Sequence, residues 1–213
     1  MGANRARDRP GGPSMDGCTS VISSWDARMN NNTEICLTKT DDVFLQDTNL
    51  EFMYSADGLN LDDLNALFIS VGFPARSLLK LQTAIQHSHK IVWIRSTRKS
   101  RFARLGQCVG FARAISDGAL CAGVWDVCVH PTWMRMGLGR GLIERIQLGL
   151  AEDGINTVAL YSEPSAAPMY RKLGFVEAEK YKALGMGFQR RSKNGSRLIR
   201  EVSASVVAAD KAK

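Results

Sequence analysis

Three glycines at alternating positions, Gly137, Gly139 and Gly141, lie between an apolar run and a stretch with helical spacing. The apolar run at 124–129 predicts a buried strand, and the apolar residues after the glycines recur with the period of an amphipathic helix. The first N–H groups of a helix have no partner within the helix, and the helix dipole makes this end positive. Because glycine has no Cβ, an anion can approach the backbone closely. The segment therefore predicts a phosphate-binding turn between a strand and a helix.

Two arginines add positive charge to this turn. Arg135 precedes the first glycine and Arg140 lies between the second and the third, and the planar guanidinium suits phosphate oxygens. The spacing excludes two common phosphate-binding motifs, because Gly-x-x-x-x-Gly-Lys-Ser/Thr is absent and the glycines do not match Gly-x-Gly-x-x-Gly. A different kind of phosphate-bearing ligand is expected.

Two blocks of the chain, in this order, resemble the GNAT superfamily of N-acetyltransferases. The glycine turn is similar to the family's acyl-CoA-binding motif, Gln/Arg-x-x-Gly-x-Gly/Ala, with Met134 at the Gln/Arg position. The block at 157–175 is similar to the family's next strand and to a short helix ending in Tyr-x-Lys-x-Gly-Phe, which begins here at Tyr170. Trp-Asp-Val at 125–127 and Leu-Tyr-Ser-Glu-Pro at 160–164 further resemble the plant and algal plastid branch, which includes serotonin N-acetyltransferase-like and protein-lysine-acetylating members.

The resemblance implies an α/β (α+β) fold, in which a mixed and centrally splayed β-sheet carries helices on both faces. It also implies acetyl-CoA as co-substrate, with its pantetheine arm bonded to the splayed strand and its pyrophosphate bonded to N–H groups of the turn. No metal is expected, because His87 and His89 lack the spacing of metal ligands. The residues expected to bind acetyl-CoA are Val127, Cys128, Val129, Arg135, Met136, Gly137, Leu138, Gly139, Arg140 and Gly141.

Three side chains are candidates for proton transfer. Tyr170 matches the family's tyrosine, whose phenol, with a pKa of about 10, donates a proton to the departing thiolate. Asp126 lies inside an apolar strand, where a carboxylate needs a partner, so it is either the base for the amine or a structural residue of the splayed strand. Glu163, at the end of the next strand, is the other candidate base, directly or through a chain of water molecules. Cys128 is expected to be a core residue rather than a nucleophile.

The resemblance thus implies an enzyme, an N-acetyltransferase that transfers acetyl from acetyl-CoA to a primary amine by direct attack in a ternary complex. The amine is either an arylalkylamine such as serotonin, for which Trp125 and Tyr161 offer an aromatic pocket, or a protein amine (lysine or N-terminus) on a shallow basic surface. The alternative is a non-catalytic acyl-CoA-binding or interaction module on the same fold. Tyr170 argues against that alternative, since a binding module needs no proton donor.

Composition restricts the other function classes. The chain has 213 residues, 45% of them hydrophobic, which suffices for one domain core, and no apolar run reaches the ~20 residues that cross a bilayer. The net charge of +7 suits an anionic nucleotide, and no nucleic-acid-binding motif accompanies it. Neither a membrane nor a nucleic acid is expected as a partner, and the oligomeric state, monomer or homodimer, is left open. Five cysteines without a Cys-x-x-Cys pair indicate reduced thiols inside the cell.

Three segments are expected along the chain. Residues 1–45 are expected to form a disordered tail, whose arginines fit a plastid or mitochondrial transit segment and whose aspartates argue against one. The resemblance implies a plastid location, with the cytoplasm as the alternative. Residues 46–190 form the N-acetyltransferase domain, and residues 191–213 form a basic extension. Strands are expected at 50–54, 91–94, 108–114, 123–129 and 158–161, with a closing pair within 175–190, and helices at 61–69, 78–85, 138–150 and 166–173.

Overall fold

A five-stranded mixed sheet forms the centre of the protein. The computed structural model describes residue 35 and residues 37–181. The strands lie in the order β1-β2-β3-β4-β5, with bounds Leu50–Met53 (β1), Lys90–Ser96 (β2), Cys108–Ser116 (β3), Cys121–Val129 (β4) and Thr157–Leu160 (β5). The first four are antiparallel neighbours, whereas β5 is parallel to β4. The predicted mixed sheet is confirmed.

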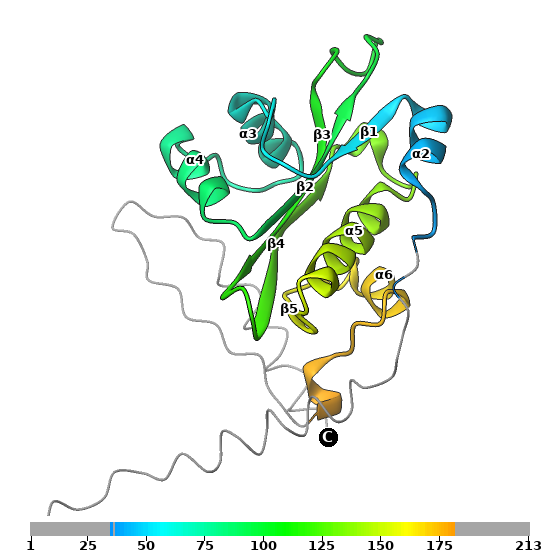
Figure 1. Ribbon diagram of the computed structural model, residues 1–213. Coiled ribbons are helices and arrows are strands. Elements are labelled where there is room, and N and C mark those ends of the chain that lie inside the picture. The colour runs from blue at the N-terminus through cyan, green and yellow to red at the C-terminus, as the bar shows by residue number, and fades with distance from the viewer. Residues whose placement is uncertain (1–34, 36, 182–213) are drawn as a thin grey trace, which may run out of the picture. The chain divides into compact units, whose positions relative to one another are not determined.

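Helices cover both faces of this sheet, as predicted (Figure 1). On one face lie α3 (Leu61–Ser70) and α4 (Leu78–Gln86), and on the other lie α5 (Leu138–Glu152) and α6 (Ala167–Lys172). Each face has its own core of buried side chains. The core on the α5 side includes Val92, Ile94, Ala112, Val124, Leu142 and Ile146. The core under α3 and α4 includes Leu64, Phe68, Trp93, Phe111 and Cys128.

The helix that follows the glycine turn has the predicted apolar stripe. Leu138, Leu142, Ile146 and Leu150 recur at helical spacing, and each is at most 1% exposed. Their burial fixes α5 against the sheet. Since only residues 130–137 separate β4 from this anchored helix, the N-terminus of α5 is held close to the end of β4.

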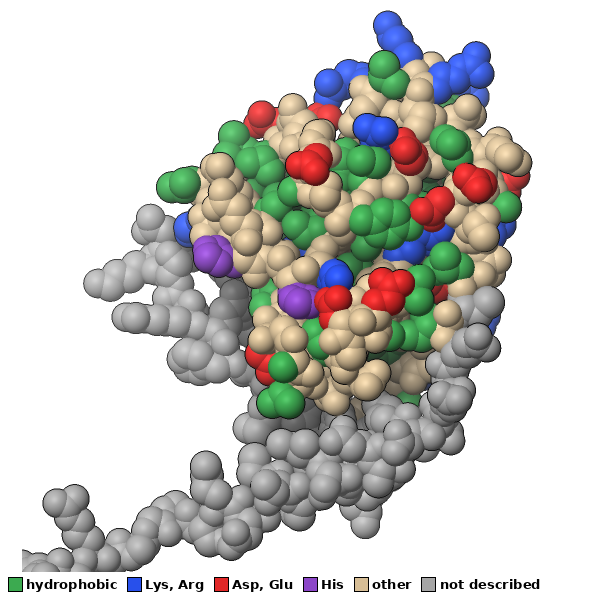
Figure 2. All heavy atoms as spheres, in the orientation of Figure 1, with side chains coloured by type: hydrophobic (Ala, Val, Ile, Leu, Met, Phe, Trp, Pro, Cys, Tyr) green, Lys and Arg blue, Asp and Glu red, His purple; other side chains and the backbone are tan. Residues whose placement is uncertain are grey.

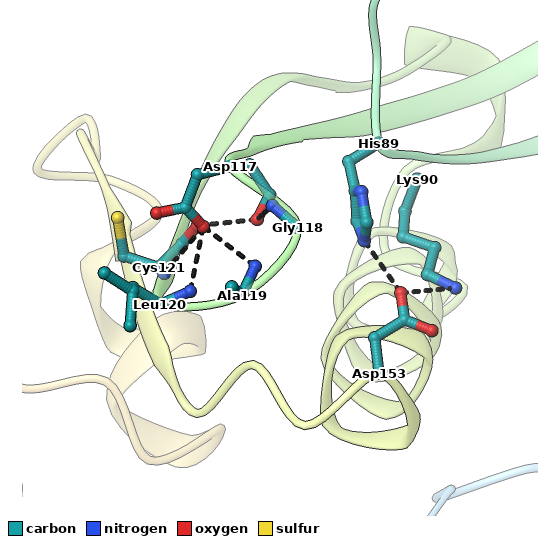
Figure 3. Close-up of polar contacts among 9 residues, drawn as sticks. His89, Lys90, Asp117, Gly118, Ala119, Leu120, Cys121 and Asp153 are labelled. Carbon is teal, nitrogen blue, oxygen red and sulfur yellow. Dashed lines mark hydrogen bonds and ion pairs between the residues drawn. The ribbon is translucent and has the colours of Figure 1, made fainter.

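Two aspartates stabilise the other end of α5 and the adjacent hairpin (Figure 3). The Asp117 carboxylate accepts hydrogen bonds from the N–H groups of residues 119–121 in the turn between β3 and β4. Asp153, which follows α5, accepts from Lys90 Nζ at 2.9 Å and from His89 Nε2 at 2.7 Å, at the start of β2. Main-chain N–H donors lower the pKa of Asp117. The pKa of Asp153 is also lowered, most by its hydrogen bond to Lys90 and next by that to His89.

Ordered structure begins earlier than the predicted strand at 50–54. The helix α2 (Asp41–Thr48) precedes β1, so residues 41–45, expected to belong to a disordered tail, are helical. The apolar pattern of α2 is weak because Phe44 is its only buried residue. A long-range contact holds it instead, in which the buried Arg145 of α5 forms an ion pair with Asp41. A bond between positions so distant along the chain leaves no local sequence signal.

Parts of the expected segments lie outside the described residues. This applies to the tail at 1–34 and to the basic extension at 191–213. Of the strand pair expected within 175–190, the structure describes only residues 175–181, which contain the short 3₁₀ helix η2 (Ala178–Tyr181). This helix belongs to a second compact unit, residues 177–213, and is described by itself. Among the described helices, none has both the length and the apolar character needed to span a membrane.

Candidate active site

The sheet is splayed between β4 and β5. The two strands pair from Cys121 opposite Thr157 to Val124 opposite Leu160, and in the described chain no β5 residue pairs with β4 beyond that point. The register between β3 and β4 also shifts between Phe111 and Arg113, opposite a bulge in β4. The second half of β4, residues 125–129, therefore has main-chain groups that face the gap rather than a neighbouring strand.

The bulge occurs at Asp126, whose φ of 53° lies in the left-handed region. Aspartate adopts this conformation more readily than most residues. The extra residue changes the strand parity, so that Val127 and Val129 pack against the core on the α5 side while Cys128 joins the core under α3 and α4. These three residues thus lie on the splayed strand, as expected. The side chains of Val127 and Val129 face one core, and that of Cys128 faces the other.

The Asp126 carboxylate forms an ion pair with Arg113 of β3. Arg113 Nε on β3 donates to Asp126 Oδ2 at 2.6 Å, and the two side chains are only 15% and 22% exposed. Arg113 Nη1 also donates a long hydrogen bond of 3.4 Å to the Ser88 hydroxyl. The Asp126 carboxylate thus has a hydrogen-bonded ion-pair partner on the neighbouring strand. Of the two roles left open by the sequence, this contact favours the structural one for Asp126. Sequence reasoning missed Arg113, although a charged residue in an apolar strand is a signal for such a pair.

The turn after β4 leads into an uncapped helix start. It passes through the 3₁₀ helix η1 (Pro131–Trp133) and reaches Gly137, whose φ of 81° favours glycine, as the residue before α5. No side chain caps this end. The N–H of Gly141 donates to the carbonyl of Gly137 at 2.9 Å, so the N–H groups that precede this first helical bond are those of Leu138, Gly139 and Arg140. These three groups lie where the sequence predicts that an anion binds.

The second and third glycines of the turn have different surroundings. A Cβ on Gly139 would meet Met169 Sδ at 3.7 Å and Val129 Cγ2 at 3.8 Å, ordinary contacts that place this residue between β4 and α6. A Cβ on Gly141 would lie 3.0 Å from Phe52 Cζ. Gly141 is therefore a buried packing glycine whose N–H is already bonded, and the expectation that it lines the phosphate site is corrected.

Positive charge surrounds this end of the sheet. Arg135 is exposed with a φ of 66°, and beside it Met136 is also exposed. The N–H of His130 donates to the carbonyl of Val109 at the start of β3, so the loop between β2 and β3 lies next to the turn. That loop contains exposed Arg98, Lys99 and Arg101, and Figure 2 shows Lys and Arg side chains gathered at the top of the molecule, where this loop lies. Such a surface attracts an anionic ligand.

Tyr170 lies on α6, close to the first turn of α5. Its neighbour Met169 is the residue nearest to a Cβ on Gly139, and its ring packs edge-on against Phe175 with centroids 5.7 Å apart. Tyr170 is 7% exposed, and burial raises the pKa of its phenol above the ordinary value of 10.0. The phenol is therefore protonated at neutral pH and able to donate a proton.

An exposed aromatic pair lies where β4 and β5 separate. The rings of Trp125 on β4 and Tyr161 after β5 have centroids 5.9 Å apart, and the residues are 43% and 68% exposed. Gly123 makes room for this arrangement, since its Cβ would lie 2.9 Å from Trp125 Nε1. Glu163 follows Tyr161 and is exposed, and its carbonyl accepts from the N–H groups of Ala166 and Ala167 at the start of α6. The structure thus brings the two predicted aromatic residues together.

The cysteines give no sign of nucleophilic chemistry. Burial raises the pKa of the Cys128 thiol well above its ordinary range and that of Cys108 to about 12, so both stay neutral at physiological pH. Within residues 37–181, Cys108, Cys121 and Cys128 are free thiols. The same part of the chain contains no group of three or more His, Cys, Asp or Glu side chains placed to hold a metal ion.

Comparisons with known proteins agree with this architecture. The family model described as an acetyltransferase (GNAT) domain matches residues 88–177. The chain is 41% identical over 140 residues to GCN5-related N-acetyltransferase 1, chloroplastic, of Arabidopsis thaliana, covering 66% of this chain and 68% of that protein. It is 42% identical over 122 residues to serotonin N-acetyltransferase 2, chloroplastic, of Oryza sativa subsp. japonica, covering 57% and 59%.

A solved structure shows the same fold. A GNAT-family acetyltransferase from Streptococcus pneumoniae superposes with a TM-score of 0.54 at 24% identity, covering 67% of this chain and 99% of the other. The splayed strand, the uncapped helix start and the tyrosine of the following short helix occur together in a chain that also has these sequence relatives. The chain belongs to the GNAT family of acetyltransferases.

Proposed function

We propose that this protein is an acetyl-CoA-dependent N-acetyltransferase that acts on a primary amine. One observation carries the proposal: β4 separates from β5 after Val124, next to the Asp126 bulge, and residues 130–137 then lead to the uncapped start of α5. A thioester donor with an amide-containing arm and a pyrophosphate matches both features. The amides of its arm pair with the free strand edge, and its phosphates accept from the N–H groups at the helix start.

The donor contacts follow from this arrangement. The main chain of Val127, Cys128 and Val129 bonds the pantetheine arm, and an N–H at this edge polarises the thioester carbonyl. The N–H groups of Leu138, Gly139 and Arg140 bond the pyrophosphate, and Gly137 supplies the left-handed turn that exposes them. Arg135 and Met136 flank the same turn, one as a charge and one as an apolar contact.

Tyr170 is the proposed general acid. When the amine nitrogen attacks the thioester carbon, the carbon–sulfur bond breaks and the sulfur leaves with the electron pair. The phenol of Tyr170 then supplies a proton to that sulfur. Its burial suits this role because the raised pKa keeps the proton in place until negative charge develops nearby.

Glu163 is the proposed acceptor of the amine proton, directly or through water. Glu163 is exposed and lies two residues after Tyr161 in the chain, whereas the Asp126 carboxylate is held by Arg113. Oδ2 of Asp126 already accepts from Arg113 Nε at 2.6 Å, so this carboxylate is engaged inside the sheet. Asp126 is accordingly assigned to holding the bulge, and Glu163 to proton removal.

The aromatic pair favours an arylalkylamine such as serotonin as the acceptor. Trp125 and Tyr161 present ring faces and edges beside the point where β4 and β5 separate, which suits a flat aromatic amine. A protein amine is the second candidate, because both residues are exposed and the basic loop between β2 and β3 gives a surface for a longer substrate. Because two relatives are named chloroplastic, we also propose a plastid location.

Thiol release from acetyl-CoA tests this function. The protein is assayed with serotonin, tryptamine and aliphatic amines, and in parallel with lysine peptides and free N-termini read by mass spectrometry. Turnover that depends on the amine supports the enzyme, and faster turnover with the aromatic amines supports the aromatic acceptor. Binding of coenzyme A without turnover of any amine would favour the non-catalytic module instead.

A further inference from the structure

Glu144 is a carboxylate buried one helical turn after Arg140. In the described chain it and its neighbour Arg145 are the two buried charged residues, each 2% exposed. Glu144 Oε1 accepts from Arg140 Nε at 2.7 Å and from the Thr38 hydroxyl, and its Oε2 accepts from the Thr38 N–H at 3.1 Å. A buried carboxylate without such donors would be costly, so these three bonds fix its position.

The bond to Arg140 leaves part of the guanidinium free. It involves Nε, whereas the two terminal nitrogens of an arginine carry four further N–H donors. The Arg140 side chain is 40% exposed, and its own main-chain N–H is one of the three at the open helix start. Glu144 thus holds one edge of the guanidinium and leaves the other edge to a ligand.

The segment before α2 completes this arrangement. Thr38 and Glu144 are 106 residues apart along the chain. Arg145 fixes the same segment, since its Nη2 donates to the carbonyl of Lys39 at 3.1 Å and its guanidinium lies 3.8 Å from the centre of the Phe52 ring. Two consecutive residues of α5 therefore secure the segment, one by accepting and one by donating.

We propose that Glu144 and Thr38 are positioning residues that orient the Arg140 guanidinium toward the phosphates of the acyl donor. The inference rests on the proposed function, because it assumes that the donor's phosphates bind at the start of α5. It adds Thr38, in the segment before α2, to the residues that determine donor affinity.

Charge alone predicts the opposite effect of removing Glu144. A negative side chain near an anion site repels the anion, so its loss would tighten binding if charge were all that mattered. Positioning predicts weaker binding, because an arginine that is no longer held loses more side-chain freedom when it meets the ligand, a cost that corresponds to about 2- to 10-fold in affinity. The sign of the change therefore separates the two explanations.

The test is the dissociation constant of coenzyme A, measured by titration calorimetry on the full chain. Glu144→Leu is expected to weaken binding by about 3- to 10-fold and Thr38→Val by about 2- to 5-fold. Glu144→Gln keeps an acceptor oxygen for Arg140 and is expected to stay within about 2-fold of the wild type. Thr40→Val is the matched control, because it removes a hydroxyl in the same segment that caps no helix N–H, and it should leave affinity unchanged.

A double-mutant cycle with Arg140→Gln shows whether the effect passes through Arg140. In that background Glu144→Leu and Thr38→Val are expected to cause no further loss of affinity. Tighter or unchanged binding by Glu144→Leu, or an equal loss in the Arg140→Gln background, would overturn the inference, provided that melting curves show folded protein. A wild-type protein that does not bind coenzyme A would instead contradict the proposed function, so the two failures are distinguishable.

Discussion

Burial has different consequences for Tyr170 and Asp126, two side chains with little exposed surface. Tyr170 has an apolar environment that raises the pKa of its phenol and keeps the group neutral. Asp126 is also largely buried, but Arg113 compensates its charge directly. Tyr170 is therefore suited to donating a proton, and Asp126 to holding the backbone in the left-handed conformation.

Tyr170→Phe is expected to lower kcat by about 10²- to 10⁴-fold and to leave the affinity for coenzyme A nearly unchanged, because only the transition state uses the proton. An acid must be protonated to act, so activity is lost as the pH rises through its pKa. Since burial raises that pKa above 10.0, wild-type activity should persist beyond pH 10 as long as the protein is folded. Tyr54→Phe, a change of the same kind at a tyrosine bonded to Asp41, should reduce stability but not turnover. Full turnover by Tyr170→Phe would assign the proton donor elsewhere.

Asp126→Asn and Glu163→Gln should separate structure from proton removal. Asn tolerates the left-handed backbone but leaves Arg113 without its counter-charge, so the free energy of unfolding should fall by about 1–3 kcal/mol while the acidic limb of the rate–pH profile persists. Glu163→Gln should remove that limb, with little change in melting temperature because the side chain is exposed. Loss of the limb in Asp126→Asn alone would reverse the two assignments.

At the scale of elements, the turn between β4 and α5 uses two of its glycines for different tasks. Gly139 borders the gap between β4 and α6, whereas Gly141 lets α5 approach β1 and α2 through Phe52 and Phe44. The alternating glycines form one pattern in the sequence, but the helix turns about 200° between the two positions, so they face different neighbours.

Gly139→Trp and Gly141→Ala should therefore have different effects. The indole at 139 fills the gap beside the uncapped N–H groups, so coenzyme A binding should fall below detection in calorimetry while the protein stays folded. The added methyl at 141 meets Phe52 at 3.0 Å, so the free energy of unfolding should fall by about 1–3 kcal/mol with coenzyme A affinity retained. Unchanged affinity in a folded Gly139→Trp variant would exclude this turn as the phosphate site.

At the scale of the whole molecule, local apolar patterns in the sequence predicted α5 and the strands of the sheet. The stripe Leu138, Leu142, Ile146 and Leu150 identified α5, and the apolar runs identified all five strands to within a few residues. The ion pair between Arg113 and Asp126 and the bonds from Thr38 to Glu144 were missed, because they join residues that meet only when the sheet and helices assemble. The helix α2 was missed for the same reason, since its contacts with α5 stabilise it more than its own pattern does.

The Asp153 contact with Lys90 and His89 ties the end of α5 to the start of β2 and should make stability depend on pH. The pKa of Asp153 is lowered in the folded protein, so its contribution is present above the unfolded value of 3.8 and is lost as the pH falls through the folded value. Asp153→Asn should therefore melt below the wild type at pH 7, and the difference should vanish toward pH 2. The neighbouring change Glu152→Gln is the control, because Glu152 is exposed, and it should leave the melting temperature at pH 7 close to that of the wild type. An equal deficit at pH 7 and pH 2 would mean that packing, not charge, explains the loss.

The short pairing between β4 and β5 has a further consequence for amide hydrogen exchange with solvent. Beyond Val124 and Leu160 the amides of β4 that face the gap are not protected by a neighbouring strand. A donor whose arm pairs with that edge would act as an additional strand and stabilise the folded form by mass action. We expect amide hydrogen exchange to slow at 126–129 and in β5 when coenzyme A is added, whereas the β1–β2 pair should exchange at its former rate.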